Sequence, residues 1–383
     1  MEQKKENAIK ILIVDDSMIT HVLLKRMLSA FPGISVVGTA KNGQEALSLI
    51  PVMNPDVIST DLHMPVMDGL AFVKEVMEKY PRPILVVSVS VQKGQNHNIF
   101  SLLEAGALDV FPKPRSGLES EYLKKAGELA GKIKILAGVR VFRKTKKGAA
   151  PLHHTLMPIK IAGGHTALKA VCIGASTGGP QALNLILSQL PSDFPLPIVC
   201  IQHISEGFLP GLIEWLRSAS EMKVEMAQEG GTPLPGVVYF PMEGAHLVID
   251  DKWRFGYSFE PPLYGHRPSI TVTFRSIAER CGAASIGVIL TGMGQDGAEG
   301  LKDIRKAGGI TMAQDEKTSV VFGMPRHAIE IGAAGRILPV DEMAAALIDE
   351  AYPAGRVEKP LNHSAPAPPG GRGTLPHGGP GGE

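Results

Sequence analysis

The chain has 383 residues, with 39 lysine and arginine residues against 38 acidic residues and a formal net charge of +1 at pH 7. This length exceeds one ordinary hydrophobic core, and domains of roughly 100 to 200 residues predict two or three of them, with two as the working number. The balanced charge does not indicate a nucleic-acid partner or an acidic-membrane partner, so we expect neither, and any binding surface is expected to be local.

The cysteines and the N-terminus indicate the compartment. Cys172, Cys200 and Cys281 each lie in or beside an apolar run without metal-ligand spacing, which predicts buried thiols in a reducing environment. The N-terminal MEQKKENAIK lacks the apolar segment of a signal peptide, and no stretch approaches the ~20 apolar residues of a membrane span. We therefore expect a cytoplasmic protein that does not insert into the membrane.

Short apolar runs alternate with amphipathic stretches from Ile9 to about Ala137. The strand-like runs are IKILIV, ISVVGTA, DVISTD, PILVVSVS and ALDVFPKP, and helix-like segments such as SMITHVLLKRMLSA lie between them. Parallel strands need crossover helices and are buried on both faces, so this alternation predicts a parallel sheet covered on both sides. We assign residues 1–137 to a flavodoxin-like domain with a five-stranded parallel sheet.

Charged and hydroxyl side chains stand at the ends of these predicted strands. Asp15 and Asp16 end the first strand, Asp61 ends the third, Ser88 ends the fourth, and Lys113 follows the fifth. Because the carboxyl ends of the strands of a doubly wound sheet meet at one crevice, we expect these side chains to converge. Clustered carboxylates need a hard cation or a lysine to offset their charge, which predicts an Mg²⁺ site. A helix-capping role would explain Asp16 alone but not the set.

The block DLHMPVMDG, with the Asp-Asp pair before it and the Lys-Pro after it, resembles the receiver domain of two-component response regulators over roughly Lys10 to Leu136. The resemblance implies that Asp61 accepts a phosphoryl group from a histidine kinase. It also assigns the residues around the phosphoryl group: Asp15, Asp16, Asp61 and the backbone carbonyl of His63 as Mg²⁺ ligands, and Ser88 and Lys113 as phosphoryl contacts.

One position departs from the receiver pattern. Val110 stands three residues before Lys113, where such domains often carry a Tyr or Phe that acts as an aromatic switch. A phosphoryl group still adds roughly −1.5 to −2 charge and strong hydrogen-bond acceptors. That change is enough to draw in Ser88 and Lys113 and to repack the adjoining face.

Two segments lack a sustained helical or strand period. Residues 138–168 predict a linker, and the Pro- and Gly-rich residues 352–383 predict a disordered tail. Residues 169–351 again show strand-length apolar runs, such as AVCIG, PIVCIQ, SIGVIL and GGITMA. We expect there a second, doubly wound α/β domain with a mostly parallel sheet and an antiparallel hairpin within Gly230–Pro262.

The stretch VCIGASTGGP, residues 171–180, leads from an apolar strand through a glycine-rich turn into a predicted helix. Its G-x-S-x-G spacing is that of a nucleophile elbow, which predicts that Ser176 is a nucleophile. The alternative is a phosphate-binding loop, but Gly179 is followed by PQALN, which lacks the lysine of such a loop. Pro180 suits the first turn of the helix and leaves the amides around Thr177 as oxyanion donors.

A nucleophilic serine requires a base and a residue that orients the base. His203 lies at the end of the strand PIVCIQ, and Asp296 lies in the glycine-rich loop after SIGVIL. If these strands are parallel to the strand before Ser176, all three side chains reach the same edge of the sheet. Their order differs from that of the α/β-hydrolases, so the elbow does not imply that fold. Position favours His203 over three competing histidines: His246, His266 and His327.

Five motifs together resemble the catalytic domain of the chemotaxis protein-glutamate methylesterases, the CheB family, from about Val171 to Val340. They are GASTGG, the Gln-His pair ending at His203, HRPS, ILTGMGQDGA and VFGMPR, and an N-terminal receiver belongs to that family's architecture. The resemblance implies hydrolysis of glutamyl methyl esters on the cytoplasmic helices of transmembrane chemoreceptors, without a cofactor for ester hydrolysis. It also implies deamidation of receptor glutamines and a chemotaxis histidine kinase as phosphoryl donor.

The same resemblance assigns the catalytic roles. Ser176 attacks the ester carbonyl, His203 takes its proton and returns it to methanol, and Asp296 orients the imidazolium. Thr177 and the loop around Met293 are the candidates for the oxyanion hole. For four further residues, a role at the site and an ordinary surface or packing role are weighed equally: Arg267, Met293, Met324 and Arg326.

Three hypotheses for the whole chain follow. The first is a phosphorylation-gated esterase in which the receiver covers the catalytic crevice until Asp61 is phosphorylated. The second is a response regulator whose C-terminal domain binds partners and keeps GASTGG as an anion-binding turn, although the presence of all three catalytic candidates argues against it. The third is a DNA-binding regulator, and the C-terminal half lacks the basic recognition helix that it requires.

Overall fold

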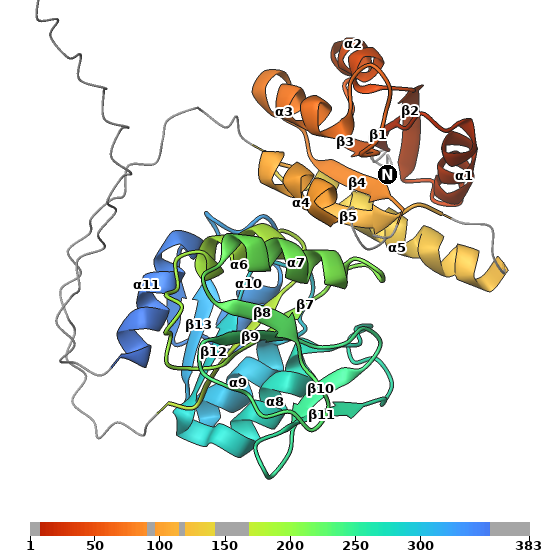
Figure 1. Ribbon diagram of the computed structural model, residues 1–383. Coiled ribbons are helices and arrows are strands. Elements are labelled where there is room, and N and C mark those ends of the chain that lie inside the picture. The colour runs from red at the N-terminus through yellow and green to blue at the C-terminus, as the bar shows by residue number, and fades with distance from the viewer. Residues whose placement is uncertain (1–7, 90–95, 115–118, 142–167, 353–383) are drawn as a thin grey trace, which may run out of the picture.

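The computed structural model describes residues 8–89, 96–114, 119–141 and 168–352. These residues form two parallel sheets, each covered by helices (Figure 1). Most of the predicted linker, residues 138–168, and nearly all of the predicted tail, residues 352–383, lie outside the described residues. Within the described ranges, no helix combines the length and the apolar character that crossing a membrane requires.

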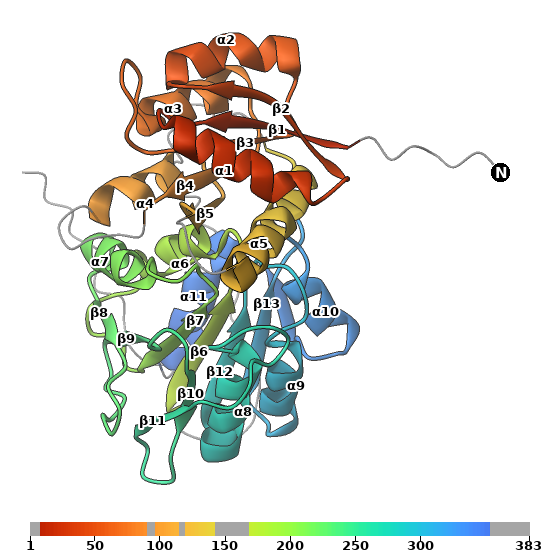
Figure 2. The same cartoon turned by 90° about the vertical axis from the view of Figure 1, so that its right-hand side faces the viewer.

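The N-terminal unit, residues 8–141, has strands that alternate with helices. Its elements are β1 (Ile9–Val14), α1 (Met18–Ser29), β2 (Ile34–Ala40), α2 (Gly43–Met53), β3 (Val57–Thr60), α3 (Gly69–Lys79), β4 (Ile84–Ser88), α4 (Asn96–Ala105), β5 (Asp109–Pro112) and α5 (Glu119–Ala137). The strands pair in parallel in the order β2-β1-β3-β4-β5, which confirms the predicted five-stranded sheet. Helices α1 and α5 cover one face, and α2, α3 and α4 cover the other (Figure 2).

The uninterrupted apolar run of β1 reflects burial on both faces. Ile11 and Ile13 pack under α1 and α5, whereas Leu12 and Val14 pack under the helices of the opposite face. Successive side chains of a strand point to opposite sides, so a strand covered on both sides has no position for a polar residue. Ser17 begins α1 because its hydroxyl accepts a hydrogen bond from the Thr20 amide, which leaves the Asp-Asp pair in the turn between strand and helix.

The C-terminal unit, residues 168–352, contains a seven-stranded parallel sheet and a separate antiparallel pair. Its elements are β6 (Ala170–Ala175), α6 (Gly179–Leu187), β7 (Ile198–Gln202), α7 (Leu209–Ala219), β8 (Lys223–Met226), β9 (Val237–Phe240), β10 (His246–Ile249), β11 (Phe255–Ser258), α8 (Ile270–Cys281), the 3₁₀ turn η1 (Gly282–Ala284), β12 (Ser285–Ile289), α9 (Ala298–Lys306), β13 (Ile310–Gln314), α10 (Met324–Glu330), β14 (Arg336–Leu338) and α11 (Val340–Ala351). The strand order is β14-β13-β12-β6-β7-β9-β8, and β10 pairs antiparallel with β11. The predicted mostly parallel sheet with an antiparallel hairpin is therefore confirmed.

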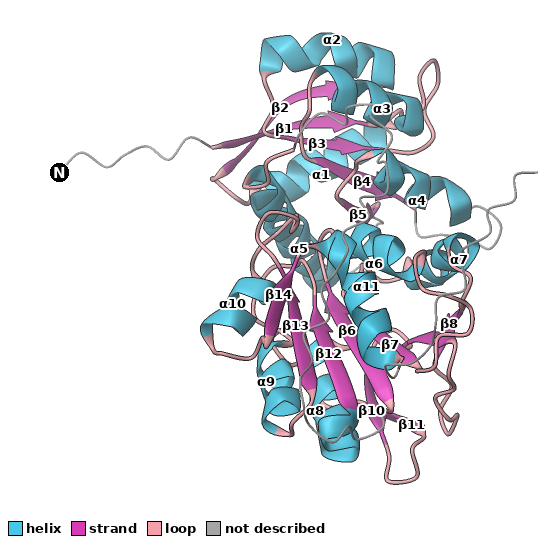
Figure 3. Cartoon of the chain, turned by 90° about the vertical axis from the view of Figure 1, so that its left-hand side faces the viewer, coloured by secondary structure: helices cyan, strands magenta, loops and turns pink. Residues whose placement is uncertain are grey.

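The two faces of this sheet are covered differently. Helices α6, α7 and α11 cover one face (Figure 3), whereas α8, α9, α10 and the β10–β11 hairpin cover the other. The interval Gly230–Pro262, predicted to form hairpins, also supplies β9, which pairs in parallel with β7 and β8. Strand β8 was not predicted, because this edge strand is largely exposed and its KVEM sequence is not an apolar run.

The N-terminal unit lies over the carboxyl edge of the seven-stranded sheet (Figures 2 and 3). Helix α4 packs against α7, where the rings of Phe100 and Trp215 stack with centroids 5.4 Å apart. The indole nitrogen of Trp215 donates to Glu104 Oε1 at 2.8 Å, and the hydroxyl of Ser205 donates to the Val110 carbonyl at 3.2 Å. The buried Val110, at the position of the usual aromatic switch, belongs to an apolar cluster that continues through both units.

Candidate functional site

The predicted phosphorylation-site residues come together at the carboxyl edge of the first sheet. Asp15, Asp16 and Asp61 each offer a carboxylate oxygen, and these oxygens lie within 4.8 Å of one another. The Nζ of Lys113 lies 2.7 Å from Asp61 Oδ2 and 2.8 Å from Asp15 Oδ2. Burial raises the pKa of Asp61, although the hydrogen bond and the charge of Lys113 oppose this effect. A set of oxygen ligands only, partly neutralised by one lysine, fits a hard divalent cation.

The two remaining residues predicted around the phosphoryl group lie on the flanking segments. Ser88 is the buried last residue of β4, and its carbonyl accepts a hydrogen bond from the Lys113 amide at 2.7 Å. His63 is exposed and lies two residues after Asp61, in the loop before α3. The bond between Ser88 and Lys113 joins the ends of β4 and β5, and the roles of the Ser88 hydroxyl and of the His63 carbonyl at the phosphoryl group stay predictions.

The glycine-rich turn at Ser176 joins β6 to α6. Gly178 has a φ of 79°, a left-handed conformation that favours glycine. At Gly179 a Cβ atom would overlap the side chain of Gln202, whose Nε2 donates to the Ser176 carbonyl at 2.8 Å. The Ser176 side chain is partly exposed, and its hydroxyl has no hydrogen bond to any residue that the structure describes. The turn thus presents an unpaired hydroxyl at the carboxyl edge of the sheet.

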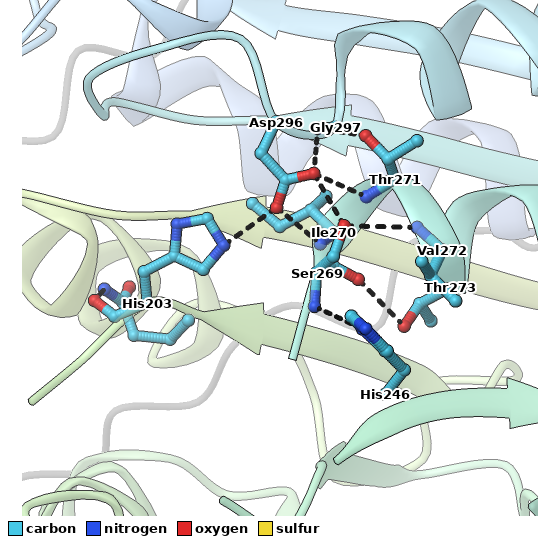
Figure 4. A network of polar contacts seen from close by, with 10 residues as sticks. His203, His246, Ser269, Ile270, Thr271, Val272, Thr273, Asp296 and Gly297 are labelled. Carbon is cyan, nitrogen blue, oxygen red and sulfur yellow. Dashed lines mark hydrogen bonds and ion pairs between the residues drawn. The ribbon is translucent and has the colours of Figure 1, made fainter. Parts of the chain in front are cut away.

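His203 and Asp296 meet at the same edge (Figure 4). His203 follows β7 and lies 3.0 Å from Asp296 Oδ2 through its Nε2. A carboxylate accepts hydrogen bonds, so Nε2 carries the proton and Nδ1 carries the lone pair. That Nδ1 is buried and has no hydrogen-bond partner among the described residues, which makes it the nitrogen available as a base.

The Asp296 carboxylate receives an unusually complete set of donors. Its side chain is almost fully buried and accepts hydrogen bonds from the hydroxyl of Ser269 and the amides of Ile270, Thr271 and Gly297, at 2.8 to 3.0 Å. Burial alone would raise the pKa of Asp296, but these bonds and His203 hold it far below its usual range. The carboxylate therefore stays ionised and can stabilise a positive charge on His203.

The two candidates for the oxyanion hole, Thr177 and Met293, follow strands of the seven-stranded sheet but differ in their surroundings. Thr177 is buried, and Met293 is 53% exposed. The backbone amides of both residues lack a hydrogen bond within the described part of the chain. The Thr177 hydroxyl donates to Asp109 Oδ2 of the N-terminal unit at 3.0 Å, and Lys132 Nζ lies 2.6 Å from the same oxygen. The elbow is thus tied to the unit that covers it.

The histidines that compete with His203 also surround the site. The ring of His266 stacks on that of His203, with centroids 3.7 Å apart and an angle of 6° between the planes. His246 is buried and bonds to Ser269, and His327 lines a cavity of about 420 Å³ beside Asp296 and His266. These three histidines were predicted only as alternatives to His203 for the base. The HRPS motif was the available signal, because it contains both His266 and Ser269.

The structure gives different surroundings to the four residues for which a role at the site and a surface or packing role were weighed equally. Arg267 is exposed and donates to the carbonyls of Phe259 and Glu260, and Arg326 lies over the ring of Phe322. Arg267 packs against its own loop, and Arg326 packs from α10 against the segment before that helix. Met324 is fully buried against Gly292, whereas Met293 stays exposed at the edge of the site.

A pH dependence of stability follows from His266. Burial, with a smaller effect of His203, lowers the pKa of His266 from 6.5 to about 4. Between these values the unfolded chain binds a proton that the folded chain excludes, so stability falls as the pH drops from about 6.5 towards 4. We expect the melting temperature to fall less between pH 7 and pH 5 in His266→Gln than in the wild type, measured by circular dichroism. Equal falls would contradict this, and His63→Gln, which alters an exposed histidine, is the control.

Comparison with known proteins gives matches for both units. Residues 11–121 match the family model for a response regulator receiver domain, and residues 171–347 match that for a CheB methylesterase. A protein-glutamate methylesterase/protein-glutamine glutaminase of Geobacter metallireducens is 40% identical over 340 residues, which are 88% of this chain and 98% of that protein. A protein of the same name from Carboxydothermus hydrogenoformans is 43% identical over 340 residues, 88% of this chain and 97% of that one. The CheB methylesterase catalytic domain structure of Thermotoga maritima is 38% identical and covers 48% of this chain and 99% of that domain, with a TM-score of 0.47.

Proposed function

Because this chain belongs to the CheB methylesterases that carry an N-terminal receiver domain, we propose that it is a phosphorylation-activated protein-glutamate methylesterase of chemotactic adaptation. It hydrolyses glutamyl methyl esters on the cytoplasmic helices of chemoreceptors to glutamate and methanol, and it deamidates receptor glutamines. The observation that carries the catalytic assignment is the 3.0 Å contact of His203 with Asp296 at the sheet edge that also bears Ser176.

The reaction proceeds in two halves on Ser176. The Ser176 Oγ attacks the ester carbonyl carbon while its proton passes to His203 Nδ1, and the same proton then leaves with the methoxide as methanol. Water next attacks the acyl-serine, gives a proton to Nδ1, and releases the glutamate side chain as Ser176 regains its proton. Asp296 keeps the other proton on Nε2 throughout, and the amides of Thr177 and Met293 donate to the oxyanion.

The receiver, residues 1–137, accepts a phosphoryl group on Asp61 from a chemotaxis histidine kinase. Asp15, Asp16, Asp61 and the His63 carbonyl hold Mg²⁺, which when bound offsets the negative charge of the carboxylates and of the phosphoryl group. The carboxylate oxygens that lie within 4.8 Å of one another support this assignment. Ser88 and Lys113 then contact the phosphoryl oxygens.

The contact between the units supports control of the esterase by the receiver. Asp109 of β5 bonds to Thr177, the residue after the nucleophile, and β5 ends one residue before Lys113. A phosphoryl group on Asp61 competes for Lys113 and repacks β5, which loosens the contact over the elbow. Unphosphorylated protein is therefore the covered, slow form.

Methanol release from methylated chemoreceptor membranes tests both parts of the proposal. We expect release by the wild type to rise with a small-molecule phosphodonor and Mg²⁺, and to lose that response in Asp61→Ala. Release should disappear in Ser176→Ala. If the wild type releases no methanol where a known methylesterase does, the result contradicts the esterase and supports the partner-binding hypothesis for the C-terminal domain.

Trp215→Ala tests the covering contact separately. The substitution removes the stack with Phe100 and the hydrogen bond to Glu104, both of which join α7 to α4. We expect a several-fold higher rate of methanol release without phosphodonor and a smaller further increase with it, because the covered form is less favoured. A rate without phosphodonor equal to that of the wild type would contradict the covering role of this contact.

A further inference from the structure

Ser269 occupies a junction between Asp296 and helix α8. Its hydroxyl donates to Asp296 Oδ1 at 2.8 Å and accepts from the amide of Val272 at 3.4 Å as the N-cap of α8. One hydroxyl hydrogen is available, and it goes to the carboxylate. The Ser269 side chain is fully buried, so it acts on the reaction only through Asp296.

His246 holds Ser269 from the other side (Figure 4). The Ser269 amide donates to His246 Nδ1 at 3.0 Å, and His246 Nε2 lies 3.3 Å from the Pro261 carbonyl. A backbone amide can only donate and a carbonyl can only accept, so Nδ1 bears the lone pair and Nε2 bears the proton. The neutral, buried ring of His246 is therefore oriented at both nitrogens, and Ser269 is held at its backbone as well as at its hydroxyl.

The same face of α8 is joined to β10 by two more hydroxyl side chains. Thr273 donates to the Leu247 carbonyl at 2.8 Å, and Ser276 bonds to both the amide and the carbonyl of Ile249 at 2.6 and 3.2 Å. With Ser269 opposite His246, these contacts repeat along one side of the helix. The β10–β11 hairpin lies outside the seven-stranded sheet, and these contacts join it to the helix whose N-terminus binds Asp296.

We propose that Ser269 is a positioning residue for Asp296, and that His246 and the β10–β11 hairpin hold it in place. The proposal rests on the proposed function, in which Asp296 orients His203. Ser269 fixes Oδ1, so that Oδ2 stays directed at His203 Nε2 and the imidazole keeps Nδ1 free for the Ser176 proton. A small misplacement of a reacting group is enough to lower a rate by about 10²-fold.

Steady-state kinetics of the full-length protein on methylated receptor membranes test this proposal. We expect Ser269→Ala to lower kcat by about 10- to 100-fold with KM within about twofold of the wild type, because a buried residue positions the base without touching substrate. Ser269→Thr keeps a hydroxyl and should restore most of kcat. Ser285→Ala is the control, since it removes a buried hydroxyl that donates to the Gly282 carbonyl, away from the contacts between α8 and the hairpin, and should lower the melting temperature without lowering kcat.

Two variants of His246 test the second half of the proposal. His246→Asn retains an acceptor near the position of Nδ1, and His246→Leu has none, so we expect kcat to fall more in the leucine variant. Both variants lose the bond to the Pro261 carbonyl, so both are expected to have a lower melting temperature than the wild type. This shared loss of stability does not explain a difference in kcat between them. Equal kcat values in the two variants would overturn the role of His246.

The labelling rate of Ser176 by diisopropyl fluorophosphate separates failure of this proposal from failure of the proposed function. The reagent reports activation of the serine without a receptor substrate, and Ser269→Ala should slow labelling while Ser269→Thr restores it. If the wild type is labelled, Ser176→Ala is inactive and Ser269→Ala matches the wild type, the positioning role alone is wrong. If the wild type is not labelled with phosphodonor and Mg²⁺ present, or Ser176→Ala still releases methanol, the proposed function and this inference fail together.

Discussion

Replacing Ser176 by alanine is expected to lower methanol release from methylated receptor membranes by about 10⁴-fold or more. The substitution removes the atom that forms the acyl intermediate. The other hydroxyl of the turn, that of Thr177, is buried and donates to Asp109. Because the Ser176 hydroxyl makes no hydrogen bond within the described residues, its loss leaves no buried group unpaired. We therefore expect the melting temperature to stay within a few degrees of that of the wild type.

The matched control is Ser188→Ala, at the other end of α6. Ser188 is exposed, and its hydroxyl donates to the Leu185 carbonyl of its own helix turn, so this variant should keep its turnover within about twofold. Turnover should be followed as methanol released, with phosphodonor and Mg²⁺ present so that the receiver does not limit the rate. Residual activity of Ser176→Ala above one hundredth of the wild type would exclude a serine nucleophile at this position.

Asp296→Asn is expected to lower turnover by about 10³- to 10⁴-fold and also to destabilise the fold. Oδ1 accepts from Ser269, Thr271 and Gly297, and Oδ2 faces Ile270 and His203, so an amide group at either place puts donor against donor. If the amide takes the place of Oδ2, His203 must turn its lone pair to it and carry its proton on Nδ1. The nitrogen needed to accept the Ser176 proton is then blocked.

Kinetics and thermal unfolding of the same preparation separate the two effects of Asp296→Asn. Asp303→Asn is the control, because it makes the same chemical change in a partly exposed ion pair with Arg275, where it should cost at most about 1 kcal/mol. An Asp296→Asn protein that is as stable as the wild type and retains more than a tenth of its turnover would contradict the orienting role. Loss of turnover at a temperature where the variant is fully folded would support it.

Strand-length apolar runs predicted most of the sheet strands, and edge strands show why some were missed. Strands covered on both faces, such as β1 and β6, are apolar throughout, so they stand out from the helices around them. The edge strand β8 is largely exposed and β11 is only partly buried. Exposed positions do not require apolar residues, so these two strands do not appear as apolar runs. The family was predicted from several spaced motifs, and the matching models and relatives confirm it.

The candidate nucleophile, the base and the aspartate that orients the base were predicted because each follows a strand. Parallel strands bring their carboxyl ends to one edge of the sheet, however far apart they are in the chain. The sequence alone therefore determined the family, the two sheets and the residues Ser176, His203, Asp296 and Asp61 as candidates. Spacing along the chain carries no information on which nitrogen of His203 faces Asp296, or on the stack with His266. Ser269 and His246 are 23 residues apart in the chain, and the packing of β10 against α8 brings the Ser269 amide to His246 Nδ1. Tertiary structure decided these contacts because hydrogen bonds act over about 3 Å and depend on direction, whereas the sequence pattern records only burial and strand order.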